Sequence, residues 1–162
     1  MRRTVVGLGG NLGDRLAHLR AGVRALRLLG SVERLSSIYE TEPLGPPQPR
    51  YLNAAVLLDT ALDAEALLDE LLRVEASQGR ERRERWGART LDLDVLWIDG
   101  SVVATPRIDV PHPGLRDRAF ALVPLLELVP DALDPLTGQR YADLTVDVHA
   151  LRRLEDRLDD PQ

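Results

Sequence analysis

Residues 80–94 read Arg-Glu-Arg-Arg-Glu-Arg-Trp-Gly-Ala-Arg-Thr-Leu-Asp-Leu-Asp, an arginine-rich run that leads directly into a pair of carboxylates. The end of this stretch alternates apolar and acidic residues, which is typical of a strand. Successive strand residues point to opposite faces of a sheet, so Asp92 and Asp94 should share one face. The opposite face should carry Leu91, Leu93 and Val95.

The two aspartates predict a magnesium site. Two carboxylates side by side on a mostly buried strand would repel each other unless a cation lay between them. Mg²⁺ typically binds one or two carboxylates and completes its shell with water and substrate phosphates. The arginines of residues 80–89 could grip those phosphates. Each feature alone is usually a solvated surface, but the two together, across a Trp-Gly pair, favour metal-assisted phosphoryl chemistry.

The composition narrows the function further. The chain has 162 residues, a net charge of −5 and no cysteine, which excludes disulfides, thiolate nucleophiles and zinc-thiolate sites. All 21 basic residues are arginine, so a Walker-A lysine and Schiff-base chemistry are excluded as well. We find no signal peptide and no apolar run near the ~18 residues of a membrane span. We therefore expect one domain, residues 1–162, in a cytoplasmic protein that binds neither nucleic acid nor membrane. Two short apolar helices and the lack of an exposed heptad pattern favour a monomer.

The order of predicted elements gives the fold class. Turn signals and helix caps separate strands at residues 3–9, 32–42, 51–60 and 90–99 from helices that follow Asp14 and Asp63 and end near Gly30 and Gln78. This order predicts an α+β, ferredoxin-like βαββαβ sandwich with an antiparallel sheet and both helices on one face. A proline-rich loop, residues 43–50, should join the two middle strands as a stiff connector or a substrate-facing loop.

Further elements should follow this unit. We expect a short strand near residues 102–104, a helix at 117–128 and an amphipathic helix near 148–158. They could cover the second face of the sheet, giving three layers, α/β/α, or its edge.

Three other functions were weighed. A dinucleotide fingerprint fails on spacing, because Leu12 stands where the third glycine after Gly7 and Gly9 belongs. A nucleic-acid-binding module of the same fold would use the arginine run as a phosphate clamp, but it would need more aromatic residues and a positive charge. A Mg²⁺-dependent phosphohydrolase explains the aspartates and leaves Tyr51, Asn53 and Phe120 without a role.

Four stretches carry a resemblance to a known family: residues 7–13, 39–55, 85–94, and Val110-Pro-His112 with Arg118-Ala-Phe120. They resemble the 6-hydroxymethyl-7,8-dihydropterin pyrophosphokinases of folate biosynthesis, in the family's order over about residues 4–130. The resemblance implies an ATP-dependent diphosphokinase that transfers pyrophosphate from ATP to the pterin and releases AMP.

The resemblance also implies roles for single residues. Two Mg²⁺ ions should be bound by Asp92 and Asp94, and the catalytic residues should be Arg80, Arg89 and Asp94. The positions that match ATP contacts are Glu75, Arg82, Arg85, Trp86, Arg107 and His112. Those that match pterin contacts are Thr41, Pro43, Leu44, Tyr51, Asn53, Trp86, Arg118 and Phe120. Leu72, Asp109 and Pro113 differ from the residues that contact the nucleotide in some relatives.

Overall fold

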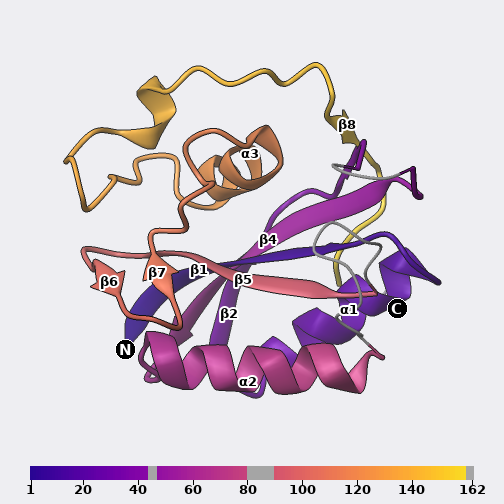
Figure 1. The fold of residues 1–162 in the computed structure, drawn as a ribbon, viewed down its shortest axis with the longest axis horizontal. Coiled ribbons are helices and arrows are strands. Elements are labelled where there is room, and N and C mark those ends of the chain that lie inside the picture. Colours follow the sequence, from indigo (N-terminus) through magenta and orange to yellow (C-terminus); the bar gives the residue numbers. More distant parts are fainter. Residues whose placement is uncertain (44–46, 80–89, 160–162) are drawn as a thin grey trace.

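The computed structural model describes residues 1–43, 47–79 and 90–159. These residues fold into a β-sheet with helices packed on both of its faces (Figure 1). An antiparallel sheet has the strand order β5-β1-β4-β3-β8, and β2 also pairs with β4. The strands of this sheet are β1 (Arg2–Gly10), β2 (Ser31–Leu35), β3 (Tyr39–Thr41), β4 (Tyr51–Thr60), β5 (Asp92–Ile98) and β8 (Arg152–Arg153). The helices are α1 (Arg15–Leu26), α2 (Ala64–Ser77), α3 (Ala119–Leu128) and the 3₁₀ turn η1 (Tyr141–Asp143). A separate hairpin consists of β6 (Val103–Ala104) and β7 (Asp109–Val110).

Helices α1 and α2 lie together on one face of the sheet (Figure 1). Each begins at the predicted cap: Asp14 accepts a hydrogen bond from the backbone N–H of Ala17 at 3.1 Å, and Asp63 from that of Ala66 at 2.9 Å. Such caps satisfy backbone donors that the first helical turn leaves open. Leucines of these helices pack on the apolar side of β1, β4 and β5, and each fully buried leucine contributes about 1.5–3 kcal/mol.

Helix α3 covers the opposite face (Figure 1). It packs on Val5, Leu57 and Leu96, and the indole Nε1 of Trp97 donates to the carbonyl of Leu133 at 2.9 Å. Leu96 and Trp97 are consecutive but both pack in this core, so the alternation of β5 breaks where β5 bulges against β1. Both faces of the sheet are therefore covered. Of the two placements considered for the later elements, α3 takes the second face and β8 the edge.

Two predicted elements differ from the structure. The strand expected at 32–42 is broken into β2 and β3, because the hydroxyl of Ser36 accepts the N–H of Ala55 at 2.8 Å in place of a backbone carbonyl. The helix expected near residues 148–158 does not form; that segment is extended and pairs with β3 through β8. None of the helices in the described ranges has the length and apolar character to cross a membrane.

Candidate active site

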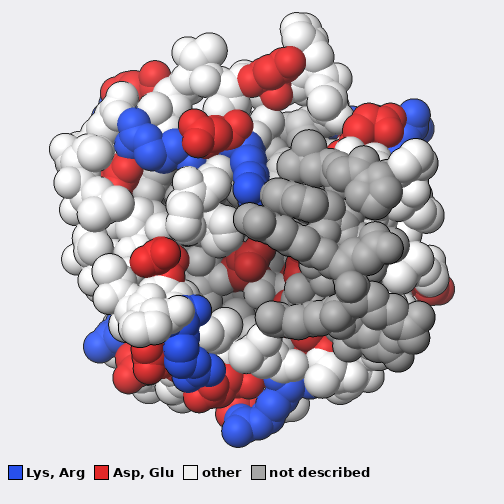
Figure 2. All heavy atoms as spheres, in the orientation of Figure 1, with Lys and Arg blue, Asp and Glu red and all other residues white. Residues whose placement is uncertain are grey.

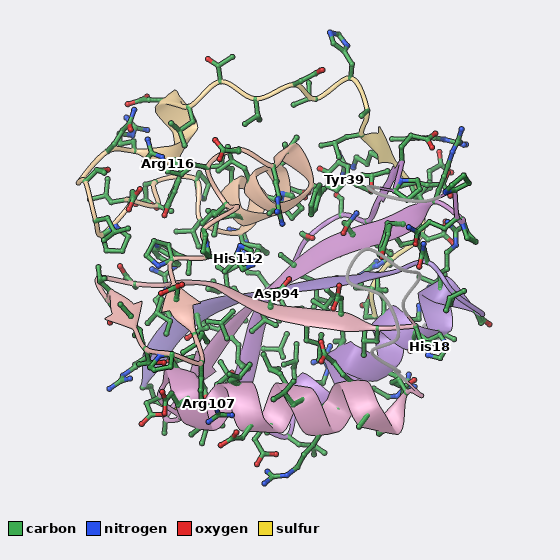
Figure 3. All side chains as sticks on the ribbon, viewed as in Figure 1. His18, Tyr39, Asp94, Arg107, His112 and Arg116 are labelled. Atoms are coloured by element: carbon green, nitrogen blue, oxygen red, sulfur yellow. The ribbon has the colours of Figure 1, made fainter. Side chains whose placement is uncertain are left out.

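Asp92 and Asp94 lie on the face of β5 that points away from α1 and α2. Leu93 and Val95 pack in the core beneath those helices, so the two aspartates face the α3 side, as the alternation predicted. Asp92 is half-buried and Asp94 is exposed. Acidic atoms occupy the middle of the face shown in Figure 2, at the place where Figure 3 labels Asp94. Two carboxylates thus share one accessible surface.

Glycines of β1 form the floor beside these carboxylates. In the antiparallel pairing of β1 with β5, Gly9 lies opposite Asp92 and Gly7 opposite Asp94. A Cβ atom added to Gly9 would approach Oδ1 of Asn53 to 2.9 Å, a distance that real Cβ atoms essentially never show. The absence of a side chain at Gly9 is therefore required by the side chain of Asn53.

The predicted pterin residues of β3 and β4 lie on the same face. Asn53 pairs with Gly9 on one side and with Tyr39 on the other, and Thr41 pairs with Tyr51. Nδ2 of Asn53 donates to Oγ1 of Thr41 at 2.8 Å, and both residues are nearly buried. This bond fixes the orientation of the Asn53 amide, leaving its Oδ1 over Gly9.

One row of paired residues, Asn53, Gly9 and Asp92, therefore crosses the sheet from β4 to β5. Asn53 and Asp92 are separated by a single strand, so their backbones are about 10 Å apart. That span suits a substrate group bound at one end and phosphate oxygens at the other. The structure brings together Thr41, Tyr51, Asn53, Asp92 and Asp94.

Glu75 lies at the edge of the sheet. Its carboxylate is almost fully buried, and its Oε2 accepts the backbone N–H of Leu93 at 2.7 Å. Leu93 stands between the two aspartates, and β5 is the last strand on this side of the described sheet. Glu75 was predicted to contact ATP; the structure gives it a contact with the backbone of β5, between the two aspartates.

His112 lies beside β5, whereas Arg107 lies against α2 (Figure 3). The N–H of His112 donates to the carbonyl of Leu96 at 2.9 Å, next to the carboxylates on β5. Its Nδ1 accepts from Gly114 at 3.0 Å, so Nε2 carries the proton of the neutral ring. Arg107 pairs with Asp69 of α2 at 2.5 Å; the hydrogen bond between them lowers the pKa of Asp69 and raises that of Arg107. A phosphate contact by Arg107 would replace Asp69.

Arg118 and Phe120 lie at the start of α3. The guanidinium carbon of Arg118 is 6.0 Å from the centroid of the Phe120 ring, at the outer limit of a cation–π contact. Gly114 leaves room for this arginine, because a Cβ there would meet Nε of Arg118 at 2.7 Å. Part of the predicted stacking surface of Phe120 thus faces an arginine.

Other predicted residues fall outside the ranges that the structure describes: Leu44, Arg80, Arg82, Arg85, Trp86 and Arg89. Pro43 is described and half-buried.

Two supporting residues escaped the sequence analysis. Nδ2 of Asn11 donates to Oε1 of Gln48 and to the carbonyl of Pro49, both at 2.8 Å, which ties the turn after β1 to the proline-rich loop. Glu127 of α3 accepts from the hydroxyl of Tyr39 at 2.6 Å and from Ser37. Only an asparagine within a glycine-rich turn hinted at the first contact, and no local pattern marked the second.

The carboxylate oxygens of Asp92 and Asp94 are donors of the kind that Mg²⁺ binds. Within the described residues no three histidine or acidic side chains gather as a cluster that could hold a metal ion. Asp92 and Asp94 supply two carboxylates on one face, the number that Mg²⁺ commonly takes from a protein when phosphates and water complete its shell. The donor set fits a metal that arrives with a phosphate substrate.

Comparisons with known proteins agree in sequence and in fold. The sequence pattern of the 7,8-dihydro-6-hydroxymethylpterin-pyrophosphokinase (HPPK) family matches residues 5–130. A 2-amino-4-hydroxy-6-hydroxymethyldihydropteridine pyrophosphokinase of Synechocystis sp. is 44% identical over 142 residues, 86% of this chain and 73% of its own. An enzyme of the same name from Methylorubrum extorquens is 40% identical over 158 residues, 96% of this chain and 100% of its own.

Solved structures share the fold. The HPPK-DHPS of Plasmodium falciparum with pteroate superposes with a TM-score of 0.70 at 13% identity, over 87% of this chain. The present chain spans 41% of that larger protein, less than half of its length. On the evidence of the sequence matches, this chain belongs to the 7,8-dihydro-6-hydroxymethylpterin-pyrophosphokinase family and is an enzyme of that type.

Proposed function

We propose that this pyrophosphokinase transfers the terminal pyrophosphoryl group of ATP to the hydroxymethyl group of 6-hydroxymethyl-7,8-dihydropterin, in a Mg²⁺-dependent reaction that releases AMP. The row Asn53, Gly9 and Asp92 is the observation that carries the proposal. It sets an amide that can read a heterocycle edge and a carboxylate that can hold metal-bound phosphates on one face of the sheet. The names of the relatives support the pterin substrate.

The pterin end of the row would bind and orient the acceptor. Oδ1 of Asn53 can accept from the N–H groups of a flat heterocycle, since its Nδ2 is already engaged by Thr41. Tyr51, half-buried on the same face, offers a stacking surface, and a stacked ring contributes about 1–3 kcal/mol by analogy with nucleobases. Holding the acceptor in place makes the transfer between two bound substrates effectively unimolecular, which lowers the entropic part of the barrier.

The carboxylate end would hold the donor. Asp92 and Asp94 would bind two Mg²⁺ ions, which when bound neutralise the charge of the triphosphate and polarise its oxygens. The His112 ring beside β5 would donate from Nε2 to a phosphate or ribose oxygen, since its Nδ1 accepts from Gly114. Arg80 and Arg89, which lie outside the described residues, are proposed to neutralise charge that develops in the transition state.

We also infer that the frame is of the ferredoxin-like type. The order β5-β1-β4-β3, the antiparallel pairings and the placement of α1 and α2 on one face support this. On this view α3 and the segment after it are additions to the βαββαβ unit.

The nucleotide product tests the proposal. The protein would be mixed with ATP, Mg²⁺ and 6-hydroxymethyl-7,8-dihydropterin, with pterin-free and metal-free controls. We expect AMP only when all three are present. ADP in place of AMP would indicate an ordinary kinase, and nucleotide turnover independent of pterin would indicate a hydrolase; either result overturns the proposal.

A further inference from the structure

Residues 145–159 lie beyond the part of the chain that matches the family, and we call them the C-terminal strap. The strap starts beside α3, where Leu144 and Val146 pack on the core beneath that helix. It ends beneath α1, where Leu154 and Leu158 join the core of the other face. Figure 1 shows the chain passing from one helix layer to the other around the β3 edge of the sheet.

The strap is held at several points along its length. In β8, Arg152 pairs with Glu40 and Arg153 with Tyr39, and the N–H of Leu154 donates to the carbonyl of Ile38 at 2.8 Å. Further on, Nε and Nη2 of Arg20 donate to the carbonyl of Arg157 at 3.0 and 2.9 Å. Leu158, 2% exposed, fixes the end in the core. Together these contacts hold β8 against the edge of β3 that faces away from β4.

Glu40 of β3 joins the strap to the start of α1 and to the end of the proline-rich loop. Its carboxylate lies 2.8 Å from Arg15 at the start of α1, and 3.8 Å from Arg50 and from Arg152 of the strap. Arg15 also donates to the carbonyl of Arg50 at 3.0 Å. Since the Glu40 side chain is only 14% exposed, these charges are screened less than those of a fully solvated pair.

The short strand β3 connects the strap to Thr41 and Asn53 in the site. Besides β8, β3 pairs with β4 over three residues, and Pro43 follows two residues after its end. Its last residue, Thr41, holds the amide of Asn53. A shift of β3 along or away from β4 would therefore turn the group that reads the acceptor.

We propose that the C-terminal strap positions Thr41 and Asn53 for the pterin through β3, with Glu40 as the junction. This inference rests on the proposed function. By linkage, if the strap favours pterin binding, the pterin must stabilise the pairing of the strap by the same factor.

Amide hydrogen exchange of the whole wild-type protein tests this reciprocity without any substitution. The probe is 6-hydroxymethyl-7,8-dihydropterin with a non-hydrolysable ATP analogue and Mg²⁺, compared with the analogue and Mg²⁺ alone. We expect the pterin to slow exchange at Leu154 at least about fivefold. Gly138, whose N–H bonds to Asp134 in a distant turn, should not change. Unchanged exchange at Leu154 when the pterin is bound overturns the proposal.

Substitution of Glu40 provides the second test. Glu40→Gln keeps the size of the side chain and leaves three arginines around a neutral amide. Glu42→Gln is the matched control, since Glu42 is 63% exposed and pairs with Arg50 alone among the described residues. We expect Glu40→Gln to raise the pterin KM about five- to twentyfold, with kcat and the ATP KM within about twofold of wild type. Glu42→Gln should resemble wild type.

The outcomes separate this proposal from the function on which it rests. Wild-type protein that neither binds nor pyrophosphorylates the pterin overturns the proposed function and the role of the strap together. Active wild-type protein with an unchanged pterin KM in Glu40→Gln overturns the role of the strap alone. An equal rise in the KM of pterin and ATP would indicate general loosening and also contradict it.

Discussion

Asn53 on β4 and Asp92 on β5 flank the same residue of β1, Gly9, and both side chains lie on the same face of the sheet. Since Gly9 has no side chain, nothing of β1 stands between the amide and the carboxylate. The sheet itself therefore sets the separation between Asn53, proposed to bind the acceptor, and Asp92, proposed to bind the metal. The spacing is built into three adjacent strands, β4, β1 and β5.

Gly9→Ala tests that relationship. The new Cβ would lie 2.9 Å from Oδ1 of Asn53, so the amide must turn and its bond to Thr41 must weaken. We expect the pterin KM to rise about tenfold, which corresponds to about 1.4 kcal/mol, with a smaller change in the ATP KM. Gly7→Ala is the comparison, because its Cβ meets the flexible tip of Leu96 at 3.0 Å. Equal effects of both variants on the pterin KM would contradict the spacing argument.

Asp92→Asn and Asp94→Asn test the carboxylate pair. Each variant removes a charge from the face proposed to bind Mg²⁺, and we expect kcat at saturating Mg²⁺ to fall at least about a hundredfold. Asp99→Asn is the control, since Asp99 follows β5, is exposed and pairs with Arg3. Steady-state rates over a Mg²⁺ titration provide the measurement. Two active aspartate variants would mean that the metal is held elsewhere.

The structural role of Glu75, its hydrogen bond to β5, can be tested without ATP. Glu75→Leu leaves the N–H of Leu93 without its acceptor, and a buried unpaired donor costs about 1–3 kcal/mol. Glu75→Gln retains an oxygen that can accept the same hydrogen bond, so its free energy of unfolding should fall less than that of Glu75→Leu. Urea unfolding measures the stability, and the Mg²⁺ dependence of the rate reports on the carboxylates. If Gln and Leu were equally destabilising, the charge of Glu75 would matter more than its hydrogen bond.

The sequence predicted the parts of the site that depend on local periodicity. The alternation around Leu93 placed Asp92 and Asp94 on one face, and the caps Asp14 and Asp63 marked the starts of α1 and α2. These features need no knowledge of distant residues, because strand pleat and helix capping act within a few positions.

Long-range contacts account for what the sequence missed. Leu151, Leu154 and Leu158 are spaced like one face of a helix, which suggested the wrong element for residues 148–158. The open edge of β3 pairs with this segment instead, and Leu154 and Leu158 reach the core from an extended chain. In the same way, the contact of Glu127 with Tyr39 joins residues 88 positions apart and has no local signature.

Tyr39 predicts a pH dependence of stability. Burial, and then the hydrogen bond to Glu127, raises the pKa of Tyr39 to about 12 from a value near 10 in the unfolded chain. The neutral phenol therefore stabilises the fold fully below pH ~10, and about 2–3 kcal/mol is lost as pH rises from ~10 to ~12.

Urea unfolding between pH 9 and 12 measures this loss. Tyr39→Phe should flatten the decline in the free energy of unfolding, although burial also raises the pKa of Tyr141, so some slope should remain. An identical slope in Tyr39→Phe and wild type would contradict the assignment.

The transfer of two phosphorus atoms together, from ATP to the pterin, is tested most directly by ³¹P NMR of the isolated pterin product. We predict two mutually coupled resonances of a diphosphate ester, with AMP as the remaining nucleotide. A single monophosphate resonance with ADP, or inorganic phosphate without a phosphorylated pterin, would contradict pyrophosphoryl transfer.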